Sequence, residues 1–465
     1  MTIYKLGEIA TVEISGVDKK IKDGEIPVKL CNFVDVYYNW AITSDLEQKF
    51  MEATARTNEI ERFKLKRGQV ALTKDSETRF DIGIATYIAD DFDNVILGYH
   101  NALITPNPEK LSGKYLNALL HTDYARTYFA NNASGSGQRY ALSIDALNNF
   151  PVPLLPLAEQ ERIGDIFSSI DQKIALNRAI NDNLEAMAKQ LYDYWFVQFD
   201  FPNEEGKPYK SSGGKMVWDD KLKREIPDGW SAKSIFDEMS VQYGFPFSTE
   251  DFTEEVTSIP VVRIRDILDN TISAYSREET DDKYRLNEAD LLIGMDGNFH
   301  MNYWIDNIAY LNQRSVRLRS KQNSNVSIVQ ARYDIEPYIK AKEQRAKGST
   351  VGHLSDKDLK ELKVMVCPNR RMRDALDSLL YRIIANRKEN LCLTKQRDDL
   401  LPLLMNGQVS VNYHLYVPLY IDSLILNYTL NARLYERNFF RSCNPPIRIQ
   451  FYSRANCDGS RDSKK

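Results

Sequence analysis

Apolar and small side chains recur every seven residues between Leu157 and Phe199. The steps alternate between four and three residues, as at the a and d positions of helices that wind about one another. The two series are Ile163, Ile170, Asn177, Leu184 and Leu191, and Phe167, Ile174, Asn181, Ala188 and Trp195. An ordinary core helix is the alternative, but such helices seldom keep an exact seven-residue spacing of apolar positions over so many turns. The pattern therefore predicts a coiled-coil helix over 157–199, roughly 60 Å long at 1.5 Å per residue.

A second stretch repeats this period nearer the C-terminus. Its two series are Leu376, Ile383, Asn390, Arg397 and Leu404, and Leu380, Arg387, Thr394 and Leu401. The offset between the two stretches is constant, so Asn390 is the equivalent of Asn177 in the second stretch. Amide side chains in an apolar seam cost stability but fix the register of the paired helices. We therefore predict a partner helix over 369–410, with Asn177 and Asn390 as register residues, and a duplicated unit.

Short strand patterns and turn residues dominate the region before each predicted helix. Residues 1–156 predict a mixed domain whose strand-like segments are 27–36, 68–73, 82–89 and 95–105, followed by a helical segment at 113–133. Residues 231–368 contain similar segments in the same order, at 259–267, 286–296 and 311–319. The expected order is thus domain, helix, domain, helix.

Two segments fall outside this plan. Residues 200–230 are polar and rich in Gly, Pro and Ser, which is typical of a linker. Residues 411–465 have no clear period and remain an unassigned tail. Asn444-Pro445-Pro446-Ile447 in this tail superficially resembles an adenine methyltransferase motif, but Ile stands where an aromatic ring should stack on a flipped base.

Composition indicates an ordinary globular protein. The chain has 465 residues, 43% hydrophobic and 27% charged, and its net charge of −4 argues against binding a polyanion over the whole surface. Long apolar runs and a signal-peptide core are missing, so we expect a cytoplasmic location and no membrane partner. The five cysteines show no CxxC or Cys/His spacing, and therefore we expect neither a zinc site nor a disulfide framework.

The sequence lacks the common catalytic patterns. The phosphate-binding pattern GxxxxGK[ST] is missing, and no Ser/His/Asp constellation or metal-binding histidine pair can be recognised. The glycine-rich segment at 134–137 follows a helical pattern rather than a strand, so it does not fit a dinucleotide loop. It is better interpreted as a turn that presents Gln138 and Arg139. We expect no catalytic residues, no metal and no cofactor.

The segments PLLPLAEQERIGDIFSSIDQKIALNRAINDNLEAMAKQLYDYWFVQF and KREIPDGW resemble the specificity subunits of type I restriction-modification systems. The resemblance extends over about residues 1–411. It implies an α+β fold in which two similar mixed α/β target-recognition domains are separated by two long helices that form an antiparallel coiled coil. Each domain would read one half of a split target in double-stranded DNA, and the helices would set the spacing of the halves.

The resemblance also implies the partners. These are two methyltransferase subunits, which modify adenine and bind S-adenosylmethionine, and motor-nuclease subunits that use ATP. The chain itself would be a non-catalytic recognition subunit. Two alternatives stay open: a coiled-coil adaptor that does not bind DNA, and a methyltransferase or nuclease with a fused recognition module.

Polar and basic side chains at strand ends and loops are the candidate DNA contacts, because such groups reach phosphates and base edges. For any one of these residues, a solvated surface charge is the simpler interpretation. The evidence for DNA binding is stronger for the whole set than for any single residue. The candidates are Lys74, Asp75, Arg79, Gln138, Arg139, Arg263, Arg265, Asp296, Asn298, His300, Arg314, Lys347, Thr350 and His353.

Overall fold

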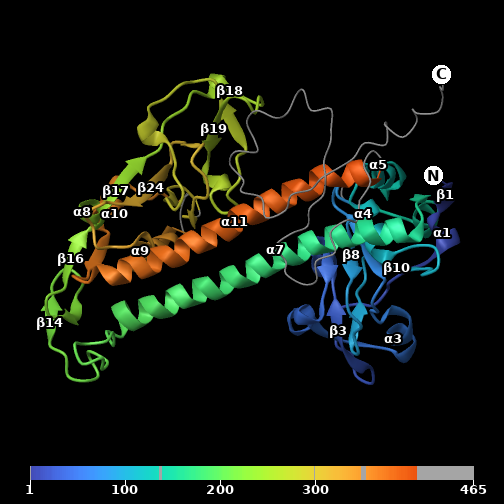
Figure 1. Cartoon of the computed structure of the whole chain (residues 1–465), viewed down its shortest axis with the longest axis horizontal. Coiled ribbons are helices and arrows are strands. Elements are labelled where there is room, and N and C mark those ends of the chain that lie inside the picture. Colours follow the sequence, from blue (N-terminus) through green and yellow to red (C-terminus); the bar gives the residue numbers. More distant parts are fainter. Residues whose placement is uncertain (1, 136–138, 298, 347–351, 406–465) are drawn as a thin grey trace, which may run out of the picture. The chain divides into compact units, whose positions relative to one another are not determined.

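The structure is a computed structural model that describes residues 2–135, 139–297, 299–346 and 352–405 (Figure 1). The predicted tail, its Asn444–Ile447 motif, and residues 406–410 of the second predicted helix lie outside the described residues. The chain forms two compact units, one of Met1–Ala175 with the chain from Leu391 onward, and one of Leu176–Asn390.

A five-stranded mixed sheet forms the centre of the first unit. Its strand order is β2-β10-β6-β8-β4, and a smaller sheet, β5-β3-β9, lies beside it. The strands are β1 (Thr2–Lys5), β2 (Ala10–Ile14), β3 (Ile26–Cys31), β4 (Ala41–Ile42), β5 (Met51–Ala55), β6 (Val70–Thr73), β7 (Asp75–Ser76), β8 (Ala85–Ile88), β9 (Val95–Leu97), β10 (Asn101–Pro106), β11 (Ser134–Gly135), β12 (Tyr140–Ala141) and β13 (Pro151–Leu154). The helices are α1 (Leu6–Ile9), α2 (Phe33–Tyr38), α3 (Thr57–Phe63), α4 (Gly113–Leu120), α5 (Asp123–Asn132) and α6 (Ile144–Asn148), with a 3-10 helix at Ser44–Lys49.

Both faces of the central sheet are buried, which explains the strand-like runs of apolar residues. On β6, Val70 and Leu72 join the core that includes α4 and α5, whereas Ala71 points into the core shared with the smaller sheet. Alternate side chains of a strand point to opposite faces. The sheet is therefore held between two apolar layers, and its strand ends project toward polar loops.

The second unit repeats this plan. The sheet β17-β24-β21-β22 corresponds to β2-β10-β6-β8, and β20-β19-β23 repeats the antiparallel and parallel pairing of β5-β3-β9. The strands are β14 (Met216–Asp219), β15 (Arg224–Pro227), β16 (Ser231–Ser234), β17 (Met239–Tyr243), β18 (Phe252–Thr253), β19 (Ile259–Val262), β20 (Ala274–Ser276), β21 (Leu291–Gly294), β22 (Met301–Tyr303), β23 (Tyr310–Leu311), β24 (Ser315–Ser320) and β25 (Lys363–Val366). The helices are α8 (Ile235–Glu238), α9 (Ile328–Ala346) and α10 (Asp356–Glu361), with a π-helix at Asp193–Val197 and 3-10 turns at Thr249–Asp251, Ile264–Asp266 and Asp282–Tyr284. The predicted α+β class with two similar mixed domains is confirmed.

Three segments differ from the sequence-based expectation. The strand pattern at 27–36 ends at Cys31, and Phe33 begins α2. The pattern at 95–105 is two strands, β9 and β10, separated by a turn. Residues 200–230, expected to be a linker, contain the hairpin β14–β15 and a stack of Phe201 on Tyr209 and Trp230. A few large aromatic side chains order this segment although its composition is polar.

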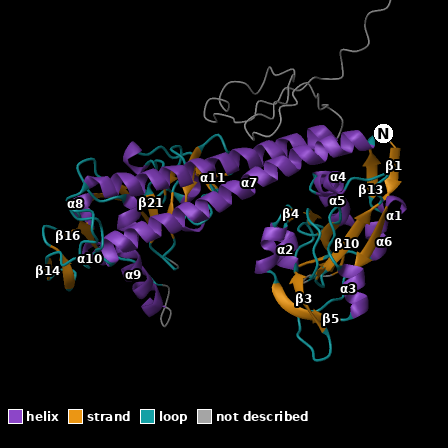
Figure 2. Ribbon diagram, turned by 60° about the horizontal axis from the view of Figure 1, so that its bottom comes forward, coloured by secondary structure: helices purple, strands orange, loops and turns teal. Residues whose placement is uncertain are grey.

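Two 36-residue helices, α7 (Leu157–Tyr192) and α11 (Arg370–Met405), lie side by side (Figures 1 and 2). Asn177 contacts Asn390 and Asn181 contacts Asn386, so residue numbers rise along one helix as they fall along the other, and the pair is antiparallel. In the first unit, Phe167 and Ile170 of α7 share a core with Leu400 of α11. In the second, Ala188 shares one with Leu380.

The heptad positions of α7 form the buried side of this pair. Ile163, Phe167, Ile170, Ile174 and Asn177 are each no more than 4% exposed. Asn177 Nδ2 donates to Asn390 Oδ1 at 2.9 Å and to Glu389 Oε2 at 2.6 Å. The polar interruption of the seam is thus matched by polar groups of the opposite helix.

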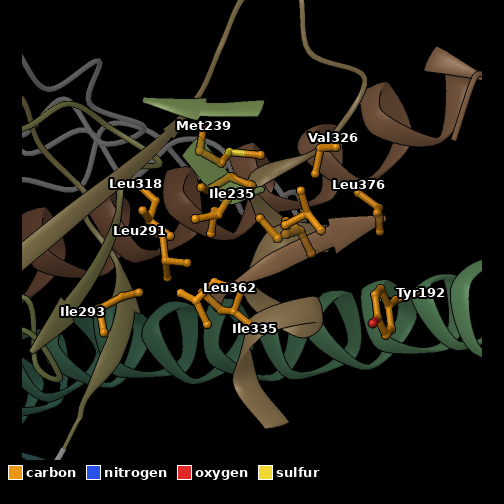
Figure 3. Packing of buried hydrophobic residues seen from close by; sticks show 14 of the residues in the cluster. Tyr192, Ile235, Met239, Leu291, Ile293, Leu318, Val326, Ile335, Leu362 and Leu376 are labelled. Atoms are coloured by element: carbon orange, nitrogen blue, oxygen red, sulfur yellow. The ribbon is translucent and has the colours of Figure 1, made fainter. Parts of the chain in front are cut away.

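The core of the second unit draws on its sheet, its short helices and both long helices. Leu291 and Leu318 of the sheet, Leu362 after α10, Tyr192 of α7 and Leu376 of α11 belong to one apolar cluster (Figure 3). Because α7 and α11 contribute side chains to this core, their positions are tied to the domain itself.

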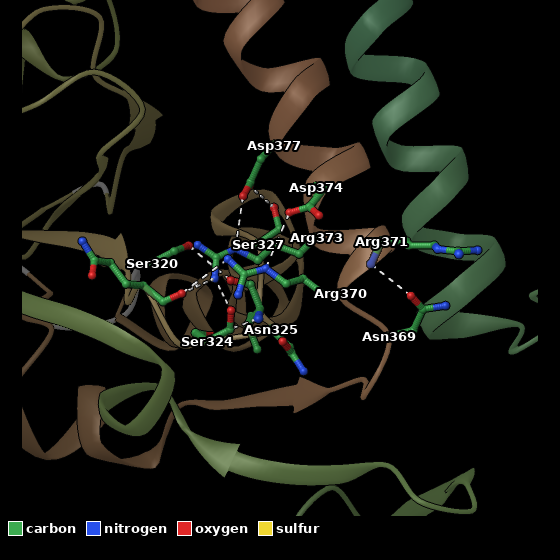
Figure 4. Close-up of polar contacts among 12 residues, drawn as sticks. Ser320, Ser324, Asn325, Ser327, Asn369, Arg370, Arg371, Arg373, Asp374 and Asp377 are labelled. Atoms are coloured by element: carbon green, nitrogen blue, oxygen red, sulfur yellow. Dashed lines mark hydrogen bonds and ion pairs between the residues drawn. The ribbon is translucent and has the colours of Figure 1, made fainter.

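A polar network holds the first turns of α11 against the segment that leads into α9 (Figure 4). Ser327 donates to Asp377 at 2.6 Å, and Arg373 bonds both Asp377 and the carbonyl oxygen of Ser324. A guanidinium has several donors in a fixed plane, so Arg373 joins several groups at once. The network fixes the start of α11 on its domain.

Asp334 of α9 provides a pH-dependent contribution to stability. Its carboxyl group accepts hydrogen bonds from Tyr192 at 2.8 Å and from the backbone N–H of Met365 at 3.0 Å, and burial raises its pKa to about 6. An unfolded aspartate titrates near pH 4. The contribution is therefore complete below about pH 4 and is lost as the pH rises through about 6.

We predict that Asp334→Asn, which cannot ionise, gains stability relative to the natural chain as the pH rises. The difference in unfolding free energy should grow by about 3 kcal/mol between about pH 4 and pH 7. Chemical denaturation followed by tryptophan fluorescence across this range measures it. The exposed Asp374→Asn, which also removes one carboxyl group, is the matched control. Parallel profiles for Asp334→Asn and the natural chain would contradict the assignment.

Candidate functional site

Four polar side chains meet at the end of β6 in the first unit. Asp75 Oδ2 lies 2.9 Å from Lys74 Nζ, 2.5 Å from His100 Nδ1 and 3.3 Å from Arg139 Nη2. The carboxylate side chain is only 10% exposed, whereas that of Arg139 is 59% exposed. We call this set, Lys74, Asp75, His100 and Arg139, the first cluster. Its acid lies inside and its arginine faces outward.

Backbone hydrogen bonds bring the three segments of the first cluster together. The N–H of Lys74 donates to the carbonyl of His100 at 2.9 Å, and the N–H of Leu142 donates to the carbonyl of Lys74 at 2.8 Å. His100 precedes β10 and has a left-handed backbone, with φ of 70°. Non-glycine residues rarely adopt this conformation. It ends the turn after β9 and directs the ring of His100 at Asp75.

The charges of the first cluster stabilise its carboxylate. Burial acts to raise the pKa of Asp75, but hydrogen bonds from His100 and Lys74 and the charges of Lys74 and Arg139 outweigh it, and the pKa is lowered. Nη2 of Arg139 also lies 2.5 Å from Nδ1 and 3.2 Å from Nε2 of His100, so the carboxylate, the imidazole and the guanidinium all contact one another.

A second cluster lies at the equivalent place in the second unit. Asp296 follows β21, its Oδ2 accepts from Arg314 Nη1 at 3.0 Å, and its Oδ1 lies 2.6 Å from His353 Nδ1. The side chains of Arg314 and His353 are 69% and 58% exposed, against 19% for Asp296. We call Asp296, Arg314 and His353 the second cluster. Again a nearly enclosed acid holds exposed cationic or aromatic groups.

The backbone framework of the two clusters is the same. Arg314 precedes β24 and has a φ of 66°, as His100 precedes β10. The N–H of Met295 donates to the carbonyl of Arg314 at 2.8 Å, and the N–H of Leu354 donates to that of Met295 at 2.7 Å. These bonds repeat those of Lys74 and Leu142. The clusters are therefore equivalent positions of a duplicated domain.

The other predicted residues fall into three groups. Arg79 lies close to the first cluster, with its guanidinium 5.2 Å from the ring centre of Tyr140, the strand neighbour of Arg139. Arg263 and Arg265 lie away from the second cluster and donate to the hydroxyl oxygen of Ser273. The backbone carbonyl of His300 accepts a hydrogen bond from the N–H of Gly294. Gln138, Asn298, Lys347 and Thr350 lie outside the described residues.

His100 was missed by sequence reasoning. It lies inside the run 95–105, which has the composition of one continuous strand, so the pattern concealed the turn that exposes it. Gly98 was the available signal, because glycine inside a strand pattern often marks an interruption.

The described ranges contain no group of three or more His, Cys, Asp or Glu side chains placed to hold a metal ion. Among these same residues, no helix has the length and apolar character that crossing a membrane requires.

Comparison with known families identifies the class of protein. The family described as the type I restriction modification DNA specificity domain matches residues 1–186 and 227–391. The chain belongs to this family, and each matched segment contains one of the two clusters.

Individual relatives are consistent with this assignment. The chain is 25% identical over 432 residues to the type I restriction enzyme MjaIX specificity subunit of Methanocaldococcus jannaschii, covering 88% of this chain and 93% of that protein. It is 32% identical over 126 residues to the HindI specificity subunit of Haemophilus influenzae, covering 27% and 28%. The crystal structure of the type I restriction-modification S subunit from M. genitalium aligns with a TM-score of 0.53 at 14% identity, over 87% of this chain and 95% of that one, and supports the fold.

Proposed function

We propose that this chain is the sequence-specificity subunit of a type I restriction-modification complex and reads a bipartite site in double-stranded DNA, one half with each domain. The observation that carries the proposal is the pair of equivalent clusters. Each places exposed donors at the end of a rigid sheet, and Arg, Lys and His at such positions suit phosphates and base edges. Two domains on one chain act on one duplex at high effective concentration.

In this proposal α7 and α11 set the number of unread base pairs between the half-sites. Support comes from the buried heptad positions of α7 and from the bonded pair Asn177 and Asn390, since a polar pair disfavours slipped alignments. The separation of half-sites follows the geometry of the protein that carries the reading elements.

The chemistry belongs to partner subunits in this proposal, two methyltransferases and the motor-nuclease subunits, and the chain itself catalyses nothing. We place the complex in the cytoplasm, where its DNA target lies.

The surface that we assign to partner helices is a stripe on α7. It is formed by Leu176, Ile180 and Met187, which are 44%, 38% and 50% exposed. Positions i, i+4 and i+11 fall on one helix face, and apolar stripes of this kind suit helix packing.

The first test is methylome sequencing of cells that contain the chain with its cognate methyltransferase subunits, against a strain without the chain. We expect a split motif with N6-methyladenine in each half, present only with the chain. An unchanged methylome, with all subunits expressed, would contradict the proposal and favour an adaptor that does not bind DNA. Cofactor binding by the isolated chain would instead favour the fused-enzyme alternative.

Lengthening both helices tests the spacer. Seven residues inserted after Ala175 and seven after Asn390 keep the heptad frame and add about 10 Å to the paired helices. We expect unchanged half-sites and a spacer longer by roughly three base pairs at about 3.4 Å each. Insertions of four residues at the same points break the frame and should abolish methylation. Altered half-sites with an unchanged spacer would contradict the role of the helices.

Asn177→Leu combined with Asn390→Leu tests the register. Removing both amides should raise the melting temperature, because leucine packs better in the seam, and should allow more than one spacer length in the methylated sites. Leu184→Ile with Leu380→Ile is a control that keeps the seam apolar. A single retained spacer length would show that other contacts set the register.

A further inference from the structure

The two clusters contain the same three chemical groups at different positions: His353 stands where the first domain has Ala141, two residues beyond Arg139, since both Ala141 and His353 pair with the aspartate of their cluster. In the first, histidine is the left-handed residue before the long strand and arginine comes from the glycine-rich loop. In the second, arginine is the left-handed residue and histidine comes from the corresponding loop. The aspartate keeps its place. Two diverged domains thus build one Asp-His-Arg arrangement by different routes.

Because the same three groups come together from different positions, we take their combination to be required chemically and not to be a packing detail kept from a common ancestor. A salt bridge that only tied the loop to the sheet would need one cation, and either position could supply it. Here each domain holds both an arginine and a histidine on one carboxylate. The shared outcome is an arginine held at one side by Asp75 or Asp296, whose carboxylate is also in contact with an imidazole.

The exposed atoms of each cluster determine what it can bind. The carboxylates are 10% and 19% exposed, and the arginines that they hold are 59% and 69% exposed. A guanidinium has donors only. It therefore suits a pair of acceptors, and in the major groove O6 and N7 of guanine are such a pair, whereas adenine and cytosine present an amino donor at the same edge.

We propose that Arg139 and Arg314 each read a guanine with the fork of their guanidinium donors, one in each half-site. Asp75 and Asp296 are the positioning residues, and His100 and His353 contact the same two carboxylates. This rests on the proposed function of the chain. In the first cluster Lys74 adds a second cation near the same acid, and Met295 takes its position in the second. The fork, rather than the total charge, is what the clusters share.

The test needs no variant at first. The half-sites come from the methylome of the natural complex, and each must contain guanine. Purified complex of the chain with its methyltransferase subunits is then titrated with duplexes in which each guanine is replaced singly by 7-deazaguanine, which lacks the N7 acceptor. We expect about tenfold weaker binding for one guanine in each half, the loss of one good base contact.

Variants assign the contacts to residues. Arg139→Ala should relax the methylated motif at that one guanine of one half-site and leave the other half unchanged, and Arg314→Ala should do the reverse. Asp75→Asn and Asp296→Asn should relax the same positions more weakly. Arg139→Lys should behave like Arg139→Ala, because lysine lacks the fork. The exposed Asp93→Asn is the control and should leave both halves intact.

A triple substitution tests the arrangement itself. His100→Arg with Arg139→Ala and Ala141→His places the groups of the first domain where the second domain has them, and should restore the guanine selection that Arg139→Ala alone loses. A half-site without guanine, unchanged binding to every 7-deazaguanine duplex, or relaxation of both halves by Arg139→Ala would overturn the proposal. These outcomes differ from failure of the proposed function, in which no split motif exists at all.

Discussion

The antiparallel pairing of α7 and α11 is the contact on which both units depend. Neither core is complete without both helices: Ile163 and Leu404 close the first, and Tyr192 and Leu376 the second. Apolar burial supplies most of the driving force in such a seam. Each half of each helix belongs both to a domain core and to the coiled coil. The helices and the domains are therefore not independent folding units.

On this framework the two domains keep their backbone hydrogen bonds and change their side chains. The bonds of Lys74 and Leu142 recur at Met295 and Leu354, and left-handed residues precede β10 and β24 alike. A constant framework with variable side chains allows two reading surfaces to differ in what they contact while both remain at the ends of rigid strands. The cost of the left-handed conformation at His100 and Arg314, typically about 1–3 kcal/mol for sparsely populated backbone regions, is offset by the surrounding contacts.

The sequence predicted the repeating features well. Heptad spacing located both long helices, because a period of seven is a property of the chain itself. It also placed Asn177 and Asn390 at equivalent positions of the two repeats, and the structure adds that their side chains share a hydrogen bond. Strand segments were found where runs of β-branched and aromatic residues stand between turn residues. The clusters were predicted only in part. Their candidate members were Lys74, Asp75, Arg139, Asp296, Arg314 and His353, but Arg263 and Arg265 were candidates too, and these bond Ser273 elsewhere in the domain. Which distant side chains share one carboxylate depends on turns such as that at His100, and no local pattern encodes these contacts.

The interleaving of the first core has a consequence for the order in which the chain folds. That core takes Leu393, Leu400 and Leu401 from the far end of the described chain. During synthesis, which runs from the N-terminus at about 5–20 residues per second, the side of α7 that these leucines cover has no partner until most of the chain has left the ribosome. The first domain is therefore begun first and completed last, and until then the apolar side of this part of α7 stays exposed.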